Sequence, residues 1–166
     1  PLPYPPAPNN PVVVDDGSSG YAEFPSGCTS IQSTTTTQSE GGSMRTMGSV
    51  IYGAATCTVR WQFPSGQPAG LYAVYVRIPS IHASTESVGY EIAYEGNTEA
   101  ISINQNAYPN PYHTADGWVY LGKYNVTAAG GEYIQLSNLT EDMDPNYASL
   151  EVGVDALMPF EVQAGM

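Results

Sequence analysis

The stretch LYAVYVRI, residues 71–78, reads with a period of two, and this period is typical of a half-buried antiparallel strand. The same period recurs in four further stretches: VGYEIAY at 88–94, WVYLGKY at 118–124, YIQL at 133–136 and LEVGVDALM at 150–158. Turn-forming residues separate these stretches, and no segment of the sequence shows a helical period. The sequence therefore predicts an all-β fold, an antiparallel β-sandwich built from residues 12–162.

The charge balance excludes two classes of partner. Four Lys and Arg residues stand against 16 Asp and Glu residues, which gives a net charge of -12. Phosphate backbones and anionic lipids both require a basic surface, so we expect neither nucleic-acid binding nor attachment to a membrane. No segment of the sequence resembles a transmembrane helix, which argues against membrane insertion.

The first eleven residues, PLPYPPAPNNP, contain six prolines and predict an extended, Pro-rich arm ahead of the sandwich. Residues 163–166 then form a short C-terminal tail. A terminal extended segment can add a strand to the edge of a sandwich, so the arm and the valines after it are candidates for docking on a neighbouring copy. The alternative is a mobile linker. The candidate contacts are Leu2, Tyr4, Val12, Val13 and Val14.

Two features favour an oxidising compartment. Cys28 and Cys57 both lie in β-like segments, and a disulfide between them would close a loop of about 30 residues, worth about 3 to 4 kcal/mol in the chain-entropy model. The alternative is a pair of buried thiols in a reducing compartment. The sequence begins at Pro1 without an initiator Met, so we expect a mature protein, extracellular or at the cell surface, whose signal peptide has been removed.

Acidic residues supply two candidate sites for calcium, which takes oxygen ligands. The first site lies in the segment TEDMDPN and consists of Glu141, Asp142 and Asp144. Their spacing fits no EF-hand, and a solvated acidic turn is the alternative. The second consists of Asp15, Asp16 and Asp155, which would meet if the first and last strands pair. There the favoured interpretation is a set of carboxylates that cap turn amides. No other cofactor is predicted.

Aromatic residues around the long irregular segment at 104–116 are candidates for stacking on a sugar. Tyr108 and Tyr112 each lie next to a proline and are the best candidates for exposure. Trp118 also flanks this segment, but it shares a predicted strand face with Tyr120 and Tyr124. Because an aromatic stripe on one face is more often core than platform, a core position is the alternative for Trp118.

The sequence does not predict an enzyme. His82 and His113 lie in loop-like segments, without a nucleophile elbow of the type G-x-S-x-G and without a neighbouring acid in the sequence. Two triplets, Asn125-Val126-Thr127 and Asn138-Leu139-Thr140, match the acceptor pattern for N-glycosylation, so Asn125 and Asn138 are candidate glycan sites.

Four segments in a fixed order resemble a known domain family. They are VDDG at 14–17, TVRWQFPSGQPAGLYAVYVRIP at 58–79, GWVYLGKYNVTAAGGEYIQLSN at 117–138 and VGVDALMP at 152–159. Together they resemble the golvesin and xanthan-lyase C-terminal type of β-sandwich domain, which looks like a carbohydrate-binding module. The resemblance implies an extracellular, non-catalytic, jelly-roll-like module of the kind appended to secreted bacterial or archaeal proteins.

Two functions follow from these observations. The preferred one is a structural subunit that assembles with copies of itself into a surface or a filament-like polymer, through its N-terminal arm. The alternative is a carbohydrate-binding module of a secreted or cell-surface protein, with polysaccharide as its partner. A polymer subunit would bury a large apolar surface between copies, whereas a sugar-binding module keeps an open aromatic groove.

Overall fold

The structure of the chain is a computed structural model. The residues that the structure describes are 13–25, 31–35, 40–64, 67–79, 81–106, 118–127, 130–142 and 150–161. Within these ranges the chain forms strands, turns and one short 3-10 turn, η1 (Glu40–Gly42), and no α-helix. The all-β prediction is therefore confirmed. None of the described helical structure is long and apolar enough to cross a membrane.

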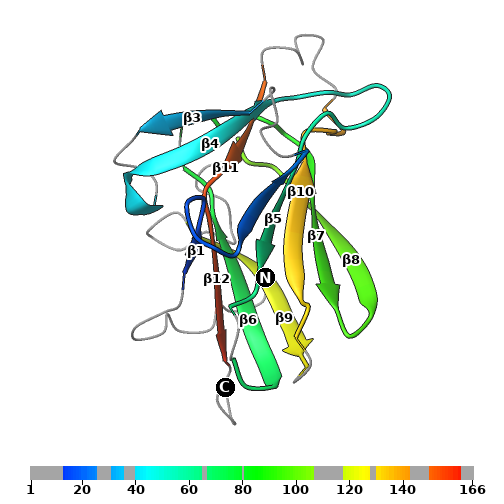
Figure 1. The fold of residues 1–166 in the computed structure, drawn as a ribbon. Coiled ribbons are helices and arrows are strands. Elements are labelled where there is room, and N and C mark those ends of the chain that lie inside the picture. The colour runs from blue at the N-terminus through cyan, green and yellow to red at the C-terminus, as the bar shows by residue number, and fades with distance from the viewer. Residues whose placement is uncertain are drawn as a thin grey trace.

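The strands pair antiparallel in three sheets (Figure 1). The four-stranded sheet has the order β1 (Val14–Asp15), β12 (Ala156–Glu161), β6 (Gly70–Arg77) and β9 (Trp118–Val126). The five-stranded sheet has the order β2 (Tyr21–Phe24), β5 (Thr58–Gln62), β10 (Tyr133–Ser137), β7 (Val88–Tyr94) and β8 (Asn97–Ile103). A smaller sheet consists of β11 (Glu151–Val154), β4 (Ser43–Gly48) and β3 (Ile31–Thr35).

The core lies between the inward faces of the sheets. On β5 and β10 every second residue is buried, so Val59, Trp61, Ile134 and Leu136 point into one cluster while their neighbours face outward. Val74 on β6 joins the same cluster from the four-stranded sheet. The strict alternation follows from the strand period of two, which is the pattern that predicted β10.

One register shift corrects a sequence-based expectation. Trp118 and Tyr120 lie in a second buried cluster on the other face of the four-stranded sheet, whereas Tyr124 belongs to the main core. The reason is a bulge: Val74 pairs with Gly122 and the next residue pairs with Tyr120, so one extra residue reverses the faces beyond it. The three aromatic residues therefore do not share a face.

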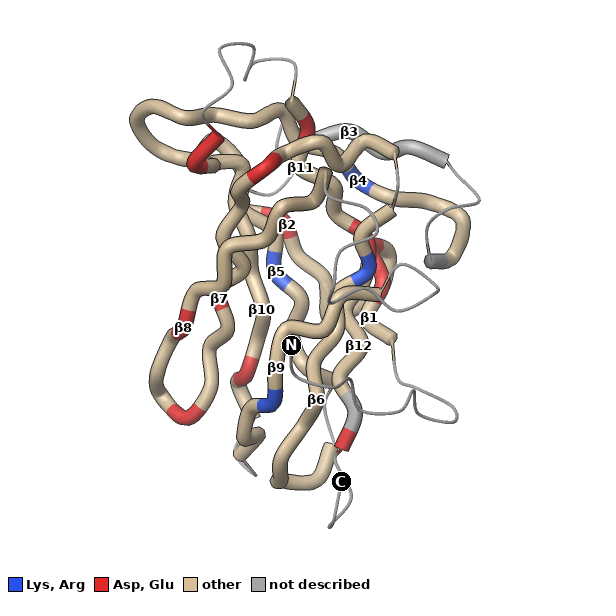
Figure 2. Tube along the Cα trace, turned by 180° about the vertical axis from the view of Figure 1, so that it is seen from behind, with Lys and Arg blue, Asp and Glu red and all other residues tan. Residues whose placement is uncertain are grey.

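Most of the described charged residues are exposed or half-buried, whereas Glu132, Asp142 and Asp155 are buried. Figure 2 shows acidic residues on the hairpin of β7 and β8, at the start of β10 and near the β12 end, with few basic residues among them. This distribution follows from the ratio of 16 acids to four basic residues, because the shortage of Lys and Arg leaves most carboxylates without a basic neighbour.

Candidate functional site

The outward face of the five-stranded sheet carries a layered arrangement around Arg60. The Arg60 guanidinium lies 3.9 Å from the ring centroid of Tyr133 and 5.1 Å from that of Phe24. Both distances fit cation–π contact. Phe24 is 46% exposed, which is high for a large apolar side chain. The three side chains come from three neighbouring strands and form a partly open aromatic and cationic surface.

A row of polar side chains continues from Arg60 across this face. Arg60, Gln135 and Glu91 are direct cross-strand partners on β5, β10 and β7. Nε and Nη2 of Arg60 donate to Oε1 of Gln135 at 3.1 and 2.8 Å, and Nε2 of Gln135 donates to Oε1 of Glu91 at 3.1 Å. Ala22 and Ala100 end the row, and their small side chains leave it open. The row is thus held in place before any ligand arrives.

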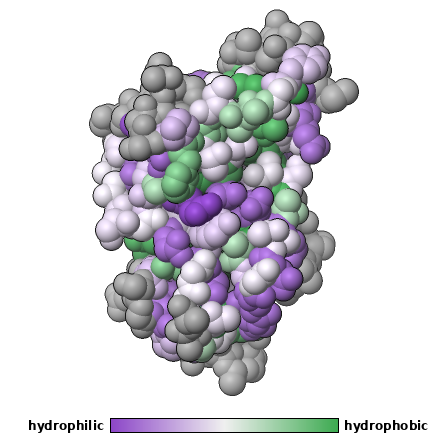
Figure 3. All heavy atoms as spheres, turned by 45° about the vertical axis from the view of Figure 1, so that its right-hand side comes forward, coloured by the Kyte–Doolittle hydropathy of each residue, from purple (hydrophilic) through white to green (hydrophobic). Residues whose placement is uncertain are grey.

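The surface view agrees with this description. Figure 3 brings the side with β7, β8 and β10 toward the viewer and shows hydrophilic residues gathered across its middle, with hydrophobic ones above them. Sequence analysis missed the site. The period of two in TVRWQF places Arg60 on the solvent side, but the residues beside it depend on the register of three strands, which sequence order does not reveal.

A second candidate site lies where the chain's first and last described strands meet. Val14 pairs with Leu157 and Asp15 with Ala156, so Asp155, directly before β12, comes close to Asp15 and Asp16. One carboxylate oxygen from each of the three aspartates lies within 4.8 Å of the other two. The sequence predicted that these residues meet if the first and last strands pair, and the structure confirms that they do.

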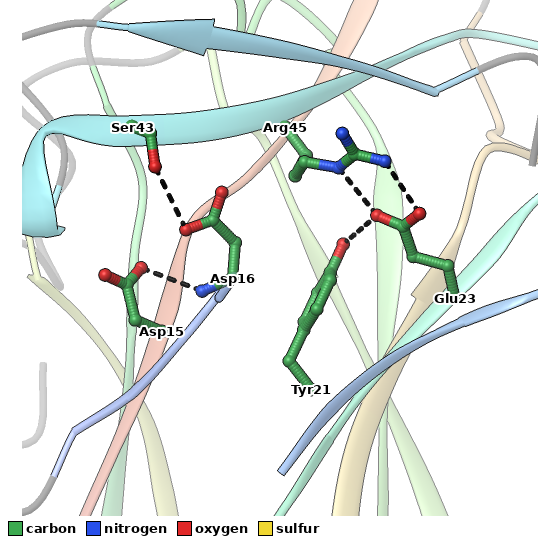
Figure 4. A network of polar contacts seen from close by, with 6 residues as sticks. All are labelled: Asp15, Asp16, Tyr21, Glu23, Ser43 and Arg45. Atoms are coloured by element: carbon green, nitrogen blue, oxygen red, sulfur yellow. Dashed lines mark hydrogen bonds and ion pairs between the residues drawn. The ribbon is translucent and has the colours of Figure 1, made fainter. Parts of the chain in front are cut away.

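The three carboxylates of this cluster are partly or fully removed from solvent. Asp155 is fully buried, and Asp15 and Asp16 are half-buried. The backbone N–H of Asp16 donates to Oδ1 of Asp15 at 2.8 Å, and Ser43 Oγ lies 3.4 Å from Oδ1 of Asp16 (Figure 4). Burial is the main cause that raises the pKa of Asp16 from 3.8 to about 7, and a hydrogen bond between the side chains of Asp16 and Asp15 and the negative charge of Asp15 act in the same direction.

Arg45, whose charge acts on Asp16, is already paired with another carboxylate. Nε and Nη2 of Arg45 donate to the two carboxylate oxygens of Glu23, both at 2.7 Å, and the Tyr21 hydroxyl donates to Oε2 at 2.7 Å (Figure 4). Burial raises the pKa of Glu23, but the hydrogen bonds from Arg45 and Tyr21 outweigh it and hold the pKa below its ordinary value. The bidentate pair ties β2 to β4. The charge of Arg45 lowers the pKa of Asp16, but it is the smallest of the causes.

The chemistry of the aspartate cluster fits a hard cation. Three carboxylates at this separation form an oxygen donor set of the kind that Ca²⁺ prefers, and a bound cation would compensate charge that burial has made costly. Without a cation, a proton on Asp16 has the same effect. Residues Asp15, Asp16 and Asp155 would hold the ion, whose role would be to join β1 to the start of β12.

The other predicted calcium site has a different environment. Asp142 is buried, Glu141 is exposed and Asp144 lies outside the described residues. Oδ2 of Asp142 accepts hydrogen bonds from Ser49, Thr85 and Thr140 at 3.0, 2.8 and 2.7 Å. Oδ1 accepts from the backbone N–H groups of Glu86 and Ser87 at 2.7 and 3.2 Å. These bonds give Asp142 a structural role, and calcium at this loop stays a prediction.

The structure describes one of the three predicted sugar-stacking residues. Tyr108 and Tyr112 lie outside the described residues, so their exposure stays a prediction. Trp118 is only 8% exposed and packs in the second cluster with Tyr75 and Tyr120. Its ring is therefore core rather than platform, which corrects its role as a candidate glycan-binding residue.

The two glycosylation triplets differ in accessibility. Asn125 is exposed on β9, where a glycan would meet solvent, and its modification stays a prediction. Asn138 is fully buried, and its Oδ1 accepts from the backbone N–H groups of Thr56 and Cys57. Its Nδ2 donates to Gly48 O and to Thr56 Oγ1. Because its side-chain amide is enclosed by these bonds, the structure argues against a glycan on Asn138.

The predicted disulfide and arm are only partly described. Cys57 is buried in the main core, while Cys28 lies outside the described residues, so the bond between them stays a prediction. Leu2, Tyr4 and Val12 also lie outside them. Val13 packs against the second cluster and Val14 pairs with β12 of its own chain. This placement gives no support to docking of the valines on another copy.

Comparison with known proteins agrees with the fold. The sequence model of the golvesin C-terminal domain matches residues 12–148. A xanthan lyase from Paenibacillus is similar over 91% of this chain and 13% of its own length, with a TM-score of 0.69 and 22% identity. A family 35 carbohydrate binding module from Clostridium thermocellum is similar over 93% of this chain and 100% of its own, with a TM-score of 0.54 and 14% identity. No curated protein matches the chain.

Proposed function

We propose that this chain, which belongs to the golvesin C-terminal domain family, is a non-catalytic, extracellular module that binds polysaccharide. The fold supports this proposal because it resembles that of a carbohydrate binding module along nearly the whole chain. The chain spans 13% of the length of the xanthan lyase, so the activity of a larger protein would lie in other domains. A module of this kind would hold such a protein on its polysaccharide.

The observation that carries the proposal is the arrangement around Arg60 on the five-stranded sheet. Sugars present flat apolar faces edged by hydroxyl groups, so they bind where planar side chains lie beside fixed hydrogen-bonding groups. Phe24 and Arg60 supply partly open planar groups. Gln135 and Glu91 supply oriented amide and carboxylate groups in the same row. Together they provide both kinds of contact on one open surface.

The aspartate cluster would support this surface indirectly. A cation held by Asp15 and Asp155 would fix β1 against β12, and β1 leads through a short turn into β2. In that turn Ser18 N donates to Asp15 O and Tyr21 N donates to Ser18 O. Since Phe24 lies on β2, loss of the cation would loosen the edge of the glycan-binding face.

The structural-subunit hypothesis, which was preferred from sequence, is less well supported than this alternative. Its physical basis was docking of the arm and the valines on a neighbouring copy, yet Val14 is paired within its own sheet. The contribution of residues 1–11 to any assembly stays a prediction. The family match and the fold of the relatives favour the carbohydrate-binding alternative.

Affinity electrophoresis against a panel of soluble neutral and acidic polysaccharides tests the proposal. We expect at least one polysaccharide to retard the protein, and Arg60→Ala to weaken that binding about tenfold, since a stacked guanidinium contributes on the order of 1 to 2 kcal/mol. Lys123→Ala is the matched control, because it removes one positive charge from an exposed position on β9. Failure of every polysaccharide to retard the wild-type protein would refute the proposed function.

A further inference from the structure

Glu91 is the acidic strand residue on the outward face of the five-stranded sheet. The five strands of this sheet contain three glutamates and one basic residue, Arg60. Glu23 and Glu99 belong to the opposite face, since the cross-strand partner of each is a residue of the main core. The strands therefore present one carboxylate and one guanidinium on the outward face, with Gln135 between them.

The surroundings of Glu91 are open to solvent. The next residues on the same face of β7 are Gly89 and Ala93, and the cross-strand partner on β8 is Ala100. Gly89 and Ala100 are exposed, while Glu91 is half-buried. Apart from its two chain neighbours, no described residue has an atom within 4 Å of the position that a Cβ atom on Gly89 would take. A ligand on this face can therefore reach the Glu91 carboxylate over small side chains.

The positive charge of Arg60 compensates Glu91 only weakly. The Arg60 guanidinium lies against the rings of Tyr133 and Phe24, and two of its nitrogens donate to Gln135. Neighbouring strands lie about 4.8 Å apart, so the backbones at Arg60 and Glu91, two strands from one another, are separated by about 10 Å. The screening length in 0.15 M salt is about 8 Å. A ligand beside Glu91 therefore meets a negative charge.

Hydrogen bonding favours hydroxyl groups beside Glu91. Its Oε1 accepts one hydrogen bond, from Gln135 at 3.1 Å, whereas a carboxylate can accept about four. A sugar hydroxyl group both donates and accepts, so it can donate to the remaining lone pairs of Glu91. The carboxylate of a uronic acid has no hydrogen to donate and adds a like charge. Both effects disfavour an acidic sugar at this position.

We infer that Glu91 makes this face selective for neutral polysaccharide, because its carboxylate accepts hydrogen bonds from sugar hydroxyl groups and repels uronic acids. The net charge of -12 acts in the same direction over longer distances. The inference rests on the proposed function, since it names the class of polysaccharide that the Arg60 surface binds.

Titration calorimetry with paired polymers tests the inference. Guar galactomannan, pullulan and xyloglucan are neutral, and oxidation of their primary hydroxyl groups to carboxylates gives acidic polymers with the same backbones. In about 0.15 M salt, which screens the more distant acids, we expect the wild-type protein to bind a neutral polymer at least about tenfold more tightly than its oxidised form. Binding of the oxidised forms as tightly as the neutral ones, or more tightly, would overturn the inference.

Glu91→Gln tests whether the selectivity comes from this carboxylate. The variant keeps the size of the side chain and removes its charge, so the preference for the neutral polymer should fall to about threefold or less. Glu99→Gln is the matched control, because it removes the same charge from the opposite face of the same sheet, and it should keep the preference within about twofold of the wild-type value. An unchanged preference in folded Glu91→Gln contradicts the role of Glu91.

A second variant leaves every charge in place. Gly89→Leu fits an exposed, open position and should cover the space beside Glu91, so we expect it to weaken binding of the neutral polymer at least about fivefold. A folded Gly89→Leu protein with unchanged affinity would show that the polysaccharide does not occupy this space, which contradicts the inference.

The outcomes separate this inference from the proposed function. If the neutral and oxidised polymers bind equally and Arg60→Ala weakens both, only the selectivity is wrong and the proposed function stands. If no polysaccharide of either kind binds, the proposed function fails, and the inference fails with it.

Discussion

The backbone of Gly41 lies directly against the carboxylate of Asp15. A Cβ atom added to Gly41 would collide with Oδ2 of Asp15, and Gly41 has a φ of 66°, in the left-handed region that favours glycine. The turn at Glu40–Gly42 therefore closes over the aspartate cluster. Two independent requirements, space and backbone conformation, call for glycine at this position.

Gly41→Ala should therefore destabilise the fold and weaken any cation site that includes Asp15. We expect a loss of about 1 to 3 kcal/mol in the free energy of unfolding, from backbone strain and from displacement of the carboxylate. Urea denaturation measures the loss. Gly17→Ala is the matched control, because Gly17 lies in the turn after β1 with open space around it. Equal stability of the two variants would show that the turn does not constrain Asp15.

The raised pKa of Asp16 predicts how stability depends on pH. The folded-state pKa is about 7, against an ordinary value of 3.8, because burial and Asp15 disfavour the charged form. The folded chain therefore holds a proton that the unfolded chain releases between these values. The stability contributed by the protonated group is complete below pH 3.8 and is lost as the pH rises through about 7.

Urea denaturation in EDTA between about pH 4 and pH 8 checks this dependence. Asp16→Asn, which imitates the protonated side chain, should remove most of the decline above pH 4. If the cluster binds calcium, adding calcium at neutral pH should restore stability to the wild-type protein but not to Asp155→Asn. A wild-type protein whose stability does not fall across this range would contradict the assignment to Asp16.

The stability that Asp142 contributes depends on pH in the opposite direction to that of Asp16. Burial raises its pKa, but hydrogen bonds from Thr140, Thr85 and the backbone of Glu86 outweigh this and lower the pKa below 3.8. Its contribution to stability is therefore present above pH 3.8 and is lost as the pH falls through the lower, folded-state value.

We expect Asp142→Ala to cost about 3 kcal/mol or more in the free energy of unfolding, since it leaves several buried donors without their acceptor. Chemical denaturation at neutral pH measures this cost. The exposed neighbour Glu141 supplies the control, and Glu141→Ala should change the free energy of unfolding by less than about 0.5 kcal/mol. A loss for Asp142→Ala no larger than that of its control would mean that the donors find water instead.

The sequence predicted the strands well because the alternation of apolar and polar residues along a strand indicates which of its side chains are buried. The period of two in YIQL corresponds to β10, and the burial of β10 follows it residue by residue. The stretch LYAVYVRI does form the strand β6, but the expectation of a half-buried strand was wrong there, because residues 72–76 are buried on both faces. The bulge on β9, between the pairs Val74–Gly122 and Tyr75–Tyr120, carried no comparable signal, so the face of Tyr124 was assigned wrongly. A bulge depends on how two strands pair, and local periodicity does not report pairing.

The candidate sites also differ in how far the sequence could predict them. The aspartate cluster was predictable because one assumption, pairing of the first and last strands, brings Asp15, Asp16 and Asp155 together. The Arg60 surface instead requires the register of several strands, because Arg60, Gln135 and Glu91 are far apart in the sequence and meet only when those strands pair.

Asn125 and Asn138 differ in exposure, so we expect them to differ in glycosylation. Secretion from a eukaryotic host should attach a glycan to exposed Asn125 and none to Asn138, whose amide is fully buried and bonded to Gly48, Thr56 and Cys57. Mass spectrometry of tryptic glycopeptides identifies the occupied residue, and Asn125→Gln should remove the glycan without loss of folding. Asn138→Gln should instead destabilise the protein, because the longer side chain cannot keep the same bonds in a close-packed site. A glycan found on Asn138 in folded protein would contradict the burial on which this prediction depends.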